Sequence, residues 1–98
     1  MGFSDRVYRL TKKIPEGRVS TYKMMAEKLG CRAYQAVGNA LNKNPYSPEV
    51  PCHRVVNSDG GIGGFANGYK NKLKMLGKEG VKIKDGKIMD FEKVLFIL

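Results

Sequence analysis

The fold is decided by residues 19–42, which read VSTYKMMAEKLGCRAYQAVGNALN. Val19–Thr21 offers hydroxyl groups that can cap a helix. From Tyr22 onward apolar residues recur at i, i+3, i+4 and i+7, until Gly30 can end the helix. After a turn around Cys31-Arg32, apolar residues again repeat at helical spacing. Two short helices joined by a tight turn are typical of a helix-turn-helix, whose second helix normally contacts a DNA groove.

The second helix of this pair has an unusual surface. Its polar face is predicted to carry Gln35 and Asn39, and its small residues are Ala36, Gly38 and Ala40. A helix with little side-chain bulk can approach a nucleic-acid backbone closely. Many helical hairpins have no nucleic-acid partner, however, so the spacing alone leaves both interpretations open.

The residues before this pair predict another helix. Phe3, Val7, Leu10 and Ile14 follow helical spacing with basic residues between them, and Pro15–Gly17 then ends the pattern. We expect this amphipathic helix to be scaffold.

The residues after the pair predict a further helix and a hairpin. Tyr69, Leu73 and Leu76 mark the apolar side of the helix, which Glu79-Gly80 closes. Its outer side is expected to carry Lys70, Lys72, Lys74 and Lys78.

The alternating run 81–84 then meets Asp85-Gly86, which is the strongest two-residue hairpin signal. The apolar tail 91–98 is expected to pack on the body. The predicted fold is mostly α: one domain over residues 1–98, a small winged-helix-like helix-turn-helix bundle with a short C-terminal β-hairpin.

Composition narrows the class of partner. The 98 residues include 18 Lys and Arg against 9 Asp and Glu, for a net charge of +9. The electrostatic field of so basic a chain favours a polyanionic binding partner, which is a nucleic acid first and an anionic membrane surface second. No apolar run approaches the ~18–20 residues of a membrane span, and no signal peptide is evident, so a cytoplasmic location is expected. One histidine and two cysteines are too few for a closed zinc site, and no metal or cofactor is expected.

Cys52 stands beside the only histidine, His53. A cysteine reacts as its thiolate, and a neighbour that accepts the proton makes it reactive. From the residues alone, a buried structural thiol next to a partly exposed histidine is the commoner arrangement.

The segment Pro51-Cys52-His53-Arg54-Val55 resembles the active-site signature of the O6-alkylguanine-DNA alkyltransferases. These DNA repair proteins take an alkyl group from damaged guanine onto their own cysteine. The resemblance spans residues 3 to 91 and implies the family's DNA-binding, catalytic domain without the amino-terminal domain that many members carry. Further matching segments, in the family's order and spacing, are Ile14–Gly17, Val19–Tyr22, Ala36–Ala40, Asn44-Pro45 and Leu76–Gly80.

The resemblance implies a role for each residue of the predicted catalytic site. Cys52 is the nucleophile, activated by His53 through a bridging water, and Glu79 orients the imidazole. Tyr22 protonates the departing guanine and helps to rotate the target phosphate. Asn44 is the hinge between the recognition helix and the active-site turn. The chain is expected to act once, because a thioether has no easy leaving group.

The resemblance also implies a DNA interface. The recognition helix enters the minor groove, which reads sequence poorly and suits a search for lesions. The glycine-rich segment 57–68 forms one wall of the base pocket, although by composition it is equally a flexible surface loop. The predicted contacts to substrate or DNA are Thr21, Arg32, Gln35, Ala36, Gly38, Asn39, Arg54, Phe65 and Ala66.

Two positions depart from the family pattern. Gln35 stands where the family usually has an arginine that replaces the flipped nucleotide in the base stack, and it lacks the charge and planar stacking of guanidinium. Neighbouring Arg32 or Tyr34 could compensate. Ala66 stands where a serine is common, so one hydroxyl contact could be missing.

Two alternative functions stay open. The first is an alkyltransferase-like protein that binds lesions with little or no transfer, against which Cys52 argues. The second is a helix-turn-helix regulator of a defined operator. On the main hypothesis the partner is double-stranded DNA containing O6-alkylguanine, and a monomer without an obligate protein partner or membrane contact is expected.

Overall fold

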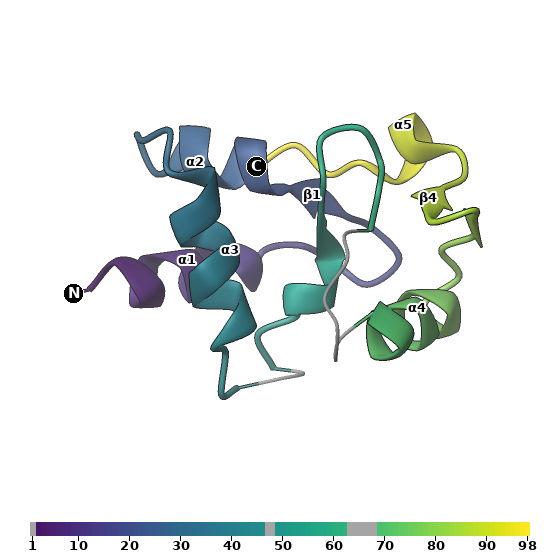
Figure 1. Ribbon diagram of the computed structural model, residues 1–98, viewed down its shortest axis with the longest axis horizontal. Coiled ribbons are helices and arrows are strands. Elements are labelled where there is room, and N and C mark those ends of the chain that lie inside the picture. Colours follow the sequence, from purple (N-terminus) through teal and green to yellow (C-terminus); the bar gives the residue numbers. More distant parts are fainter. Residues whose placement is uncertain (1, 47–48, 63–68) are drawn as a thin grey trace.

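The computed structural model describes residues 2–46, 49–62 and 69–98. The helices and strands lie in the order α1 (Phe3–Thr11), β1 (Ser20–Thr21), α2 (Tyr22–Lys28), α3 (Tyr34–Asn42), the 3-10 turn η1 (Cys52–Arg54), β2 (Val55–Val56), α4 (Tyr69–Lys78), β3 (Ile83–Lys84), β4 (Lys87–Ile88) and α5 (Phe91–Val94). The predicted fold class is confirmed: the chain is mostly helical, with a helix-turn-helix and a late hairpin (Figure 1).

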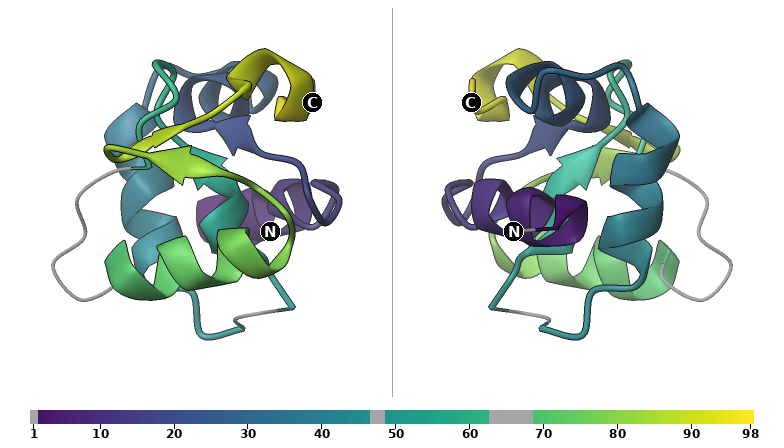
Figure 2. Two further views of the ribbon diagram at one scale, coloured as in Figure 1. Left: turned by 90° about the vertical axis from the view of Figure 1, so that its right-hand side faces the viewer. Right: turned by 90° about the vertical axis from the view of Figure 1, so that its left-hand side faces the viewer.

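The helices pack around two apolar clusters. The first lies among α1, α2 and α3, with Val7, Met25 and Val37 fully buried. The second lies under α4 and the hairpin and includes Ile62 and Leu76. Strands β1 and β2 lie between α1 and α4 (Figure 1), whereas the end-on views show α4 and β4 together at one end of the molecule and α1 at the other (Figure 2).

The parallel pair β1–β2 fixes the position of the cysteine motif. Ser20 pairs with Val55 and Thr21 with Val56. Because η1 leads directly into β2 and α2 follows directly on β1, this register brings Cys52 close to the first turn of α2. The sequence pattern did not predict β1 and β2, because two-residue strands carry little periodicity and no turn signal like Asp85-Gly86 lies between these two.

The caps of the helix-turn-helix follow the prediction. The Thr21 hydroxyl oxygen accepts a hydrogen bond from the backbone N–H of Met24 at 3.0 Å, which satisfies one free donor of α2. Gly30 ends this helix region with a φ of +77°, in the left-handed region that glycine adopts freely.

Helix α1 is shorter than predicted. It ends at Thr11, whereas the apolar spacing extended it to Ile14. The N–H groups of Lys13 and Ile14 bond to carbonyls three residues back, and this tighter turn still buries Ile14 before Pro15.

The C-terminal part contains the predicted hairpin and one element that was not predicted. Asp85 and Gly86 both have positive φ, as the two-residue turn requires. The tail forms α5, and then Leu95 pairs with Val19 beside β1.

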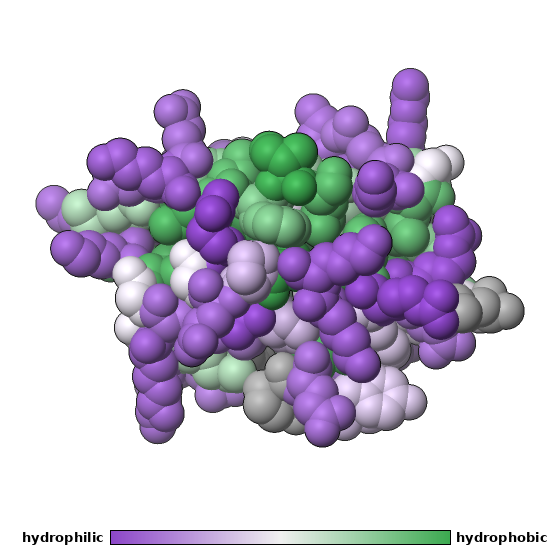
Figure 3. All heavy atoms as spheres, turned by 180° about the vertical axis from the view of Figure 1, so that it is seen from behind, coloured by the Kyte–Doolittle hydropathy of each residue, from purple (hydrophilic) through white to green (hydrophobic). Residues whose placement is uncertain are grey.

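Seen from behind, an apolar area of the surface is surrounded by hydrophilic side chains (Figure 3). Within the parts of the chain described, no helix has the length and apolar character of a membrane span.

Candidate active site and nucleic-acid interface

Backbone hydrogen bonds place Cys52. The carbonyl of Val50 accepts from the N–H of Cys52 and from the side-chain amide of Asn44, each at 2.8 Å. The other end of the Asn44 side chain accepts from the N–H of Tyr46 at 2.9 Å. The Asn44 side chain therefore links Tyr46, just after α3, to Val50, just before the cysteine turn. Cys52 remains partly exposed.

His53 is held by Glu79, a residue that follows α4. The Nε2 atom of His53 lies 2.9 Å from Oε2 of Glu79, and only 4% of the His53 side chain is exposed. Arg54 binds the same carboxylate through Nε at 2.9 Å and Nη2 at 2.6 Å. The N–H of Gly17 adds a longer contact of 3.4 Å.

The charges of this cluster are set by burial and by these contacts. Burial opposes ionisation of Glu79, but hydrogen bonds from Arg54 and His53 outweigh it and lower the pKa of Glu79 to about 2. Burial lowers the pKa of His53 below its ordinary value, while the hydrogen bond to Glu79 acts in the opposite direction. At neutral pH we therefore assign an ionised Glu79 and a neutral His53.

These charges determine the histidine tautomer. An ionised carboxylate can only accept hydrogen bonds, so Nε2 of His53 must carry the hydrogen and Nδ1 must carry the free electron pair. Nδ1 is buried and has no hydrogen-bond partner among the residues that the structure describes. It is the nitrogen able to accept a proton.

Lys72 was expected on the outer side of its helix, and that prediction is wrong. The Lys72 side chain is 5% exposed, and its Nζ donates to the carbonyl of Val55 at 2.7 Å. It also lies 3.4 Å from the hydroxyl of Tyr22 and 5.6 Å from the centre of that ring. The spacing contained the signal, since Lys72 is four residues before Leu76 on the apolar side of α4.

Cys52 is an electrostatic neighbour of both Tyr22 and Lys72. Burial raises the pKa of Tyr22 to about 12, and Cys52 adds to the rise. Burial lowers the pKa of Lys72 to about 8, and Cys52 acts in the opposite direction. Tyr22 is therefore protonated at neutral pH and can act as a hydrogen-bond donor.

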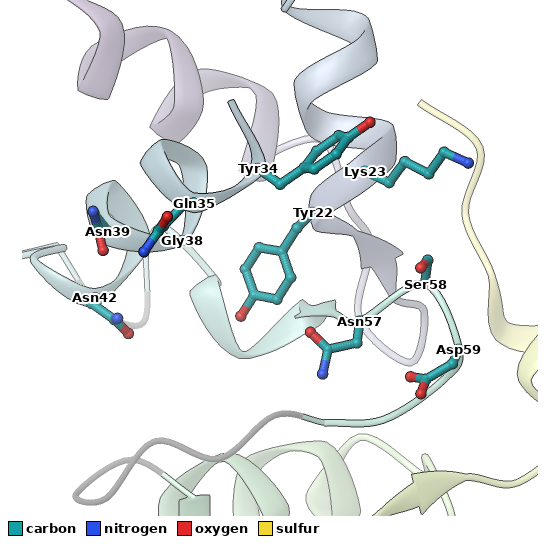
Figure 4. Close-up of a pocket in the computed structure, with 10 residues that line it drawn as sticks. All are labelled: Tyr22, Lys23, Tyr34, Gln35, Gly38, Asn39, Asn42, Asn57, Ser58 and Asp59. Carbon is teal, nitrogen blue, oxygen red and sulfur yellow. The ribbon is translucent and has the colours of Figure 1, made fainter. Parts of the chain in front are cut away.

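An open groove of about 610 Å³ lies between the helix-turn-helix and the segment after β2. The ring of Tyr22 projects into it, and Gln35 and Asn39 lie along its side on α3 (Figure 4). The predicted polar face of α3 and the predicted catalytic tyrosine therefore line the same groove. The lining residues are Tyr22, Lys23, Tyr34, Gln35, Gly38, Asn39, Asn42, Asn57, Ser58 and Asp59.

The other predicted contacts have different surroundings. Arg32 is exposed in the turn before α3, Ala36 is half-buried, and Thr21 is buried as the cap of α2. Arg54 is bound to Glu79 and to the carbonyl of Ile14 at 2.9 Å. Phe65 and Ala66 lie outside the described residues.

The fold and these contacts define a helix-turn-helix domain with a cysteine beside a buried histidine–glutamate pair. Residues 2–81 match the family described as 6-O-methylguanine DNA methyltransferase, DNA binding domain, and the chain belongs to this family.

Curated relatives agree with this assignment. A methylated-DNA–protein-cysteine methyltransferase of Saccharolobus solfataricus is 48% identical over 81 residues, covering 83% of this chain and 52% of the relative. The protein with the same description from Metallosphaera sedula is 46% identical over 82 residues, or 84% of this chain and 51% of the relative. The chain thus spans about half the length of these relatives.

Solved structures resemble the chain in fold as well. The O6-methylguanine-DNA methyltransferase of Pyrococcus kodakaraensis has a TM-score of 0.74 at 41% identity, covering 83% of this chain and 47% of that protein. S. pombe Atl1, in complex with damaged DNA containing O6-carboxymethylguanine, has a TM-score of 0.85 at 31% identity, covering 96% of this chain and 94% of that one.

Proposed function

We propose that this chain repairs DNA by transferring an alkyl group from O6 of guanine in duplex DNA to Cys52. The observation that carries the proposal is the surroundings of Cys52 in the chain and in the fold. The next residue, His53, forms a buried pair with Glu79, and Cys52 is an electrostatic neighbour of both Tyr22 and Lys72. A nucleophile, a base and an orienting group are the parts that covalent catalysis needs.

The transfer is a displacement at the alkyl carbon. The proton of the Cys52 thiol passes through a bridging water to Nδ1 of His53, and the ionised Glu79 stabilises the imidazolium that forms. The thiolate then forms the sulfur–carbon bond as the bond from carbon to O6 breaks. Tyr22 donates a proton to the leaving guanine and then regains one from solvent. The imidazolium releases the thiol proton to solvent, so that the net proton movement is from the thiol to guanine.

Lys72 supports Tyr22 during this step. Its ammonium group lies beside the Tyr22 hydroxyl and would stabilise the oxygen as the proton leaves. The thioether product has no easy leaving group, so each chain acts once.

The proposed DNA interface is the polar face of α3 with the groove beside it. The target base is stacked inside the duplex, so it must flip out to reach Cys52. In this proposal α3 enters the minor groove, where the small Ala36 and Gly38 allow a close approach and Gln35 takes the place of the flipped nucleotide. Asn39 lines the same groove, Arg32 is exposed in the turn before α3, and Thr21 is buried as the cap of α2. In this proposal the lysines and arginines of the +9 chain neutralise phosphates.

A second candidate is a protein that binds lesions without transferring the alkyl group. Gln35 at the arginine position favours it, because glutamine stacks and attracts the backbone less well than guanidinium. Similarity to Atl1 over nearly the whole of both chains also supports it. The presence of Cys52 beside His53 favours transfer.

The deciding experiment measures the intact mass of the protein after mixing with duplex DNA that carries one O6-methylguanine. We expect a gain of one methyl group, at most one per chain. The gain should be absent with an undamaged duplex and with Cys52→Ala, whose folding is checked by its melting temperature. Tight lesion binding with unchanged mass would overturn the transfer proposal and leave the second candidate.

A further inference from the structure

We infer that Arg54 is a positioning residue for His53: by clamping Glu79 it keeps the imidazole neutral, with Nδ1 as the basic nitrogen. The inference deepens the proposed function and rests on it where it concerns catalysis. Its statement about the imidazole can be measured without DNA.

The geometry of the Glu79 carboxylate carries the inference. Oε1 accepts from Nε of Arg54 at 2.9 Å and from the N–H of Gly17 at 3.4 Å. Oε2 accepts from Nη2 of Arg54 at 2.6 Å and contacts Nε2 of His53 at 2.9 Å. A two-pronged guanidinium contact fixes the plane of a carboxylate as well as its position.

Arg54 is itself anchored at its other side. Its Nη1 donates to the carbonyl of Ile14 at 2.9 Å, in the turn that follows α1. The Arg54 side chain is 17% exposed and that of Glu79 is 10% exposed, so solvent screens their contact only in part. The guanidinium therefore bridges Glu79 and the turn after α1, and the DNA contact expected for Arg54 stays a prediction.

The electrostatic effect follows from the charges that face His53. Burial lowers the pKa of His53 most, Glu79 raises it, and Arg54 and Lys72 lower it. Cys52 is the preceding residue in the chain. A lone Glu79 anion at 2.9 Å would stabilise the imidazolium, and a protonated His53 cannot accept the thiol proton. Arg54 offsets this anion while holding it in place as an acceptor.

The test uses the fact that His53 is the only histidine, so its imidazole gives a single NMR titration in the free protein. In Arg54→Met the midpoint of this titration should move to higher pH. In Arg54→Lys, which keeps the charge but loses the two-pronged contact, it should move less. Arg9→Met removes an exposed arginine of α1 and should leave the midpoint unchanged.

The same variants connect the midpoint to transfer. The acid limb of the transfer rate against pH should move upward together with the NMR midpoint. A folded Arg54→Met protein with an unchanged or lower midpoint would overturn the inference. If that variant does not fold, Arg54→Lys decides by the same criterion. If the wild type transfers no methyl group, the proposed function fails, and the titration still tests Arg54.

Discussion

At the scale of single residues, Gly17 explains why a motif far from Cys52 in sequence belongs to the same site. Gly17 has a φ of +82°, and a Cβ there would stand 3.3 Å from the backbone oxygen of Glu79. The glycine thus allows both the turn after α1 and the close approach of the residue that holds His53. The family resemblance identified Ile14–Gly17 as a matching segment, and the structure supplies the physical reason.

The departure at Gln35 gives a prediction at the same scale. Gln35 lines the groove on the exposed face of α3. Replacing it with arginine adds a planar cation that can stack in the gap left by the flipped base. We expect a gain of about 1 kcal/mol, of the order of a cation–π contact, which is about a fivefold faster transfer if flipping limits the rate. Single-turnover transfer to a duplex with one O6-methylguanine measures this.

Asn42→Arg is the matched control, because Asn42 lines the same groove and the change adds the same charge. This variant should tighten binding to damaged and undamaged duplexes alike without a comparable gain in transfer rate. Equal transfer rates for the two variants would mean that the added charge alone causes the gain. Residue 35 would then not take the place of the flipped nucleotide in the base stack.

Single residues also show which features of the fold and site the sequence can predict and which it cannot. Thr21 as a cap, Gly30 as a helix end and Asp85-Gly86 as a hairpin turn were predictable because each depends on local backbone geometry. The burial of Lys72 was missed because charge was allowed to outweigh spacing. The contact of Arg54 with Glu79 joins residues 25 positions apart, and no local pattern encodes it.

At the scale of elements, α3 carries a glycine that packing does not require. A Cβ at Gly38 would meet no heavy atom of the described chain within 4 Å, and the position is half-buried in the middle of the helix. Glycine weakens a helix interior relative to alanine. The open space beside Gly38 therefore fits the proposal that a DNA backbone approaches there.

This gives a prediction in which stability and function change in opposite directions. Gly38→Ala should raise the free energy of unfolding by about 0.5–1 kcal/mol, because alanine favours the helix and meets no clash. The same methyl group should weaken binding to duplex DNA, because it occupies the space that the backbone would use. Urea unfolding and fluorescence anisotropy with a labelled duplex measure the two effects.

Gly77→Ala is the control for that experiment. Gly77 lies in α4 and is exposed, and a Cβ added there would likewise meet no heavy atom of the described chain within 4 Å. Its replacement should stabilise the helix without affecting DNA affinity. Unchanged DNA affinity in Gly38→Ala would remove α3 from the proposed interface at this point.

At the scale of the whole molecule, the two apolar clusters are connected by β1, β2 and the C-terminal segment. Val19 donates to the carbonyl of Val94 at 2.9 Å and accepts from the N–H of Phe96 at 2.6 Å. Arg18 donates to the carbonyls of Val94 and Leu95, and its guanidinium carbon lies 6.0 Å from the centre of the Phe96 ring. The tail thus extends the strand pairing that places Tyr22 beside Cys52.

This connection predicts that the tail contributes to the stability of the whole chain. Phe96 is half-buried against the first cluster, so Phe96→Ala should lower the free energy of unfolding by about 1–3 kcal/mol. Ile97 is 70% exposed, and Ile97→Ala should cost much less. In urea unfolding both variants should keep one transition, because the clusters share β1 and β2.

A loss of stability for Ile97→Ala as large as that for Phe96→Ala would contradict the packing role of Phe96. A separate early unfolding transition in Phe96→Ala would show that the tail stabilises only one of the two apolar clusters. The stability of the cysteine site would then not depend on the tail.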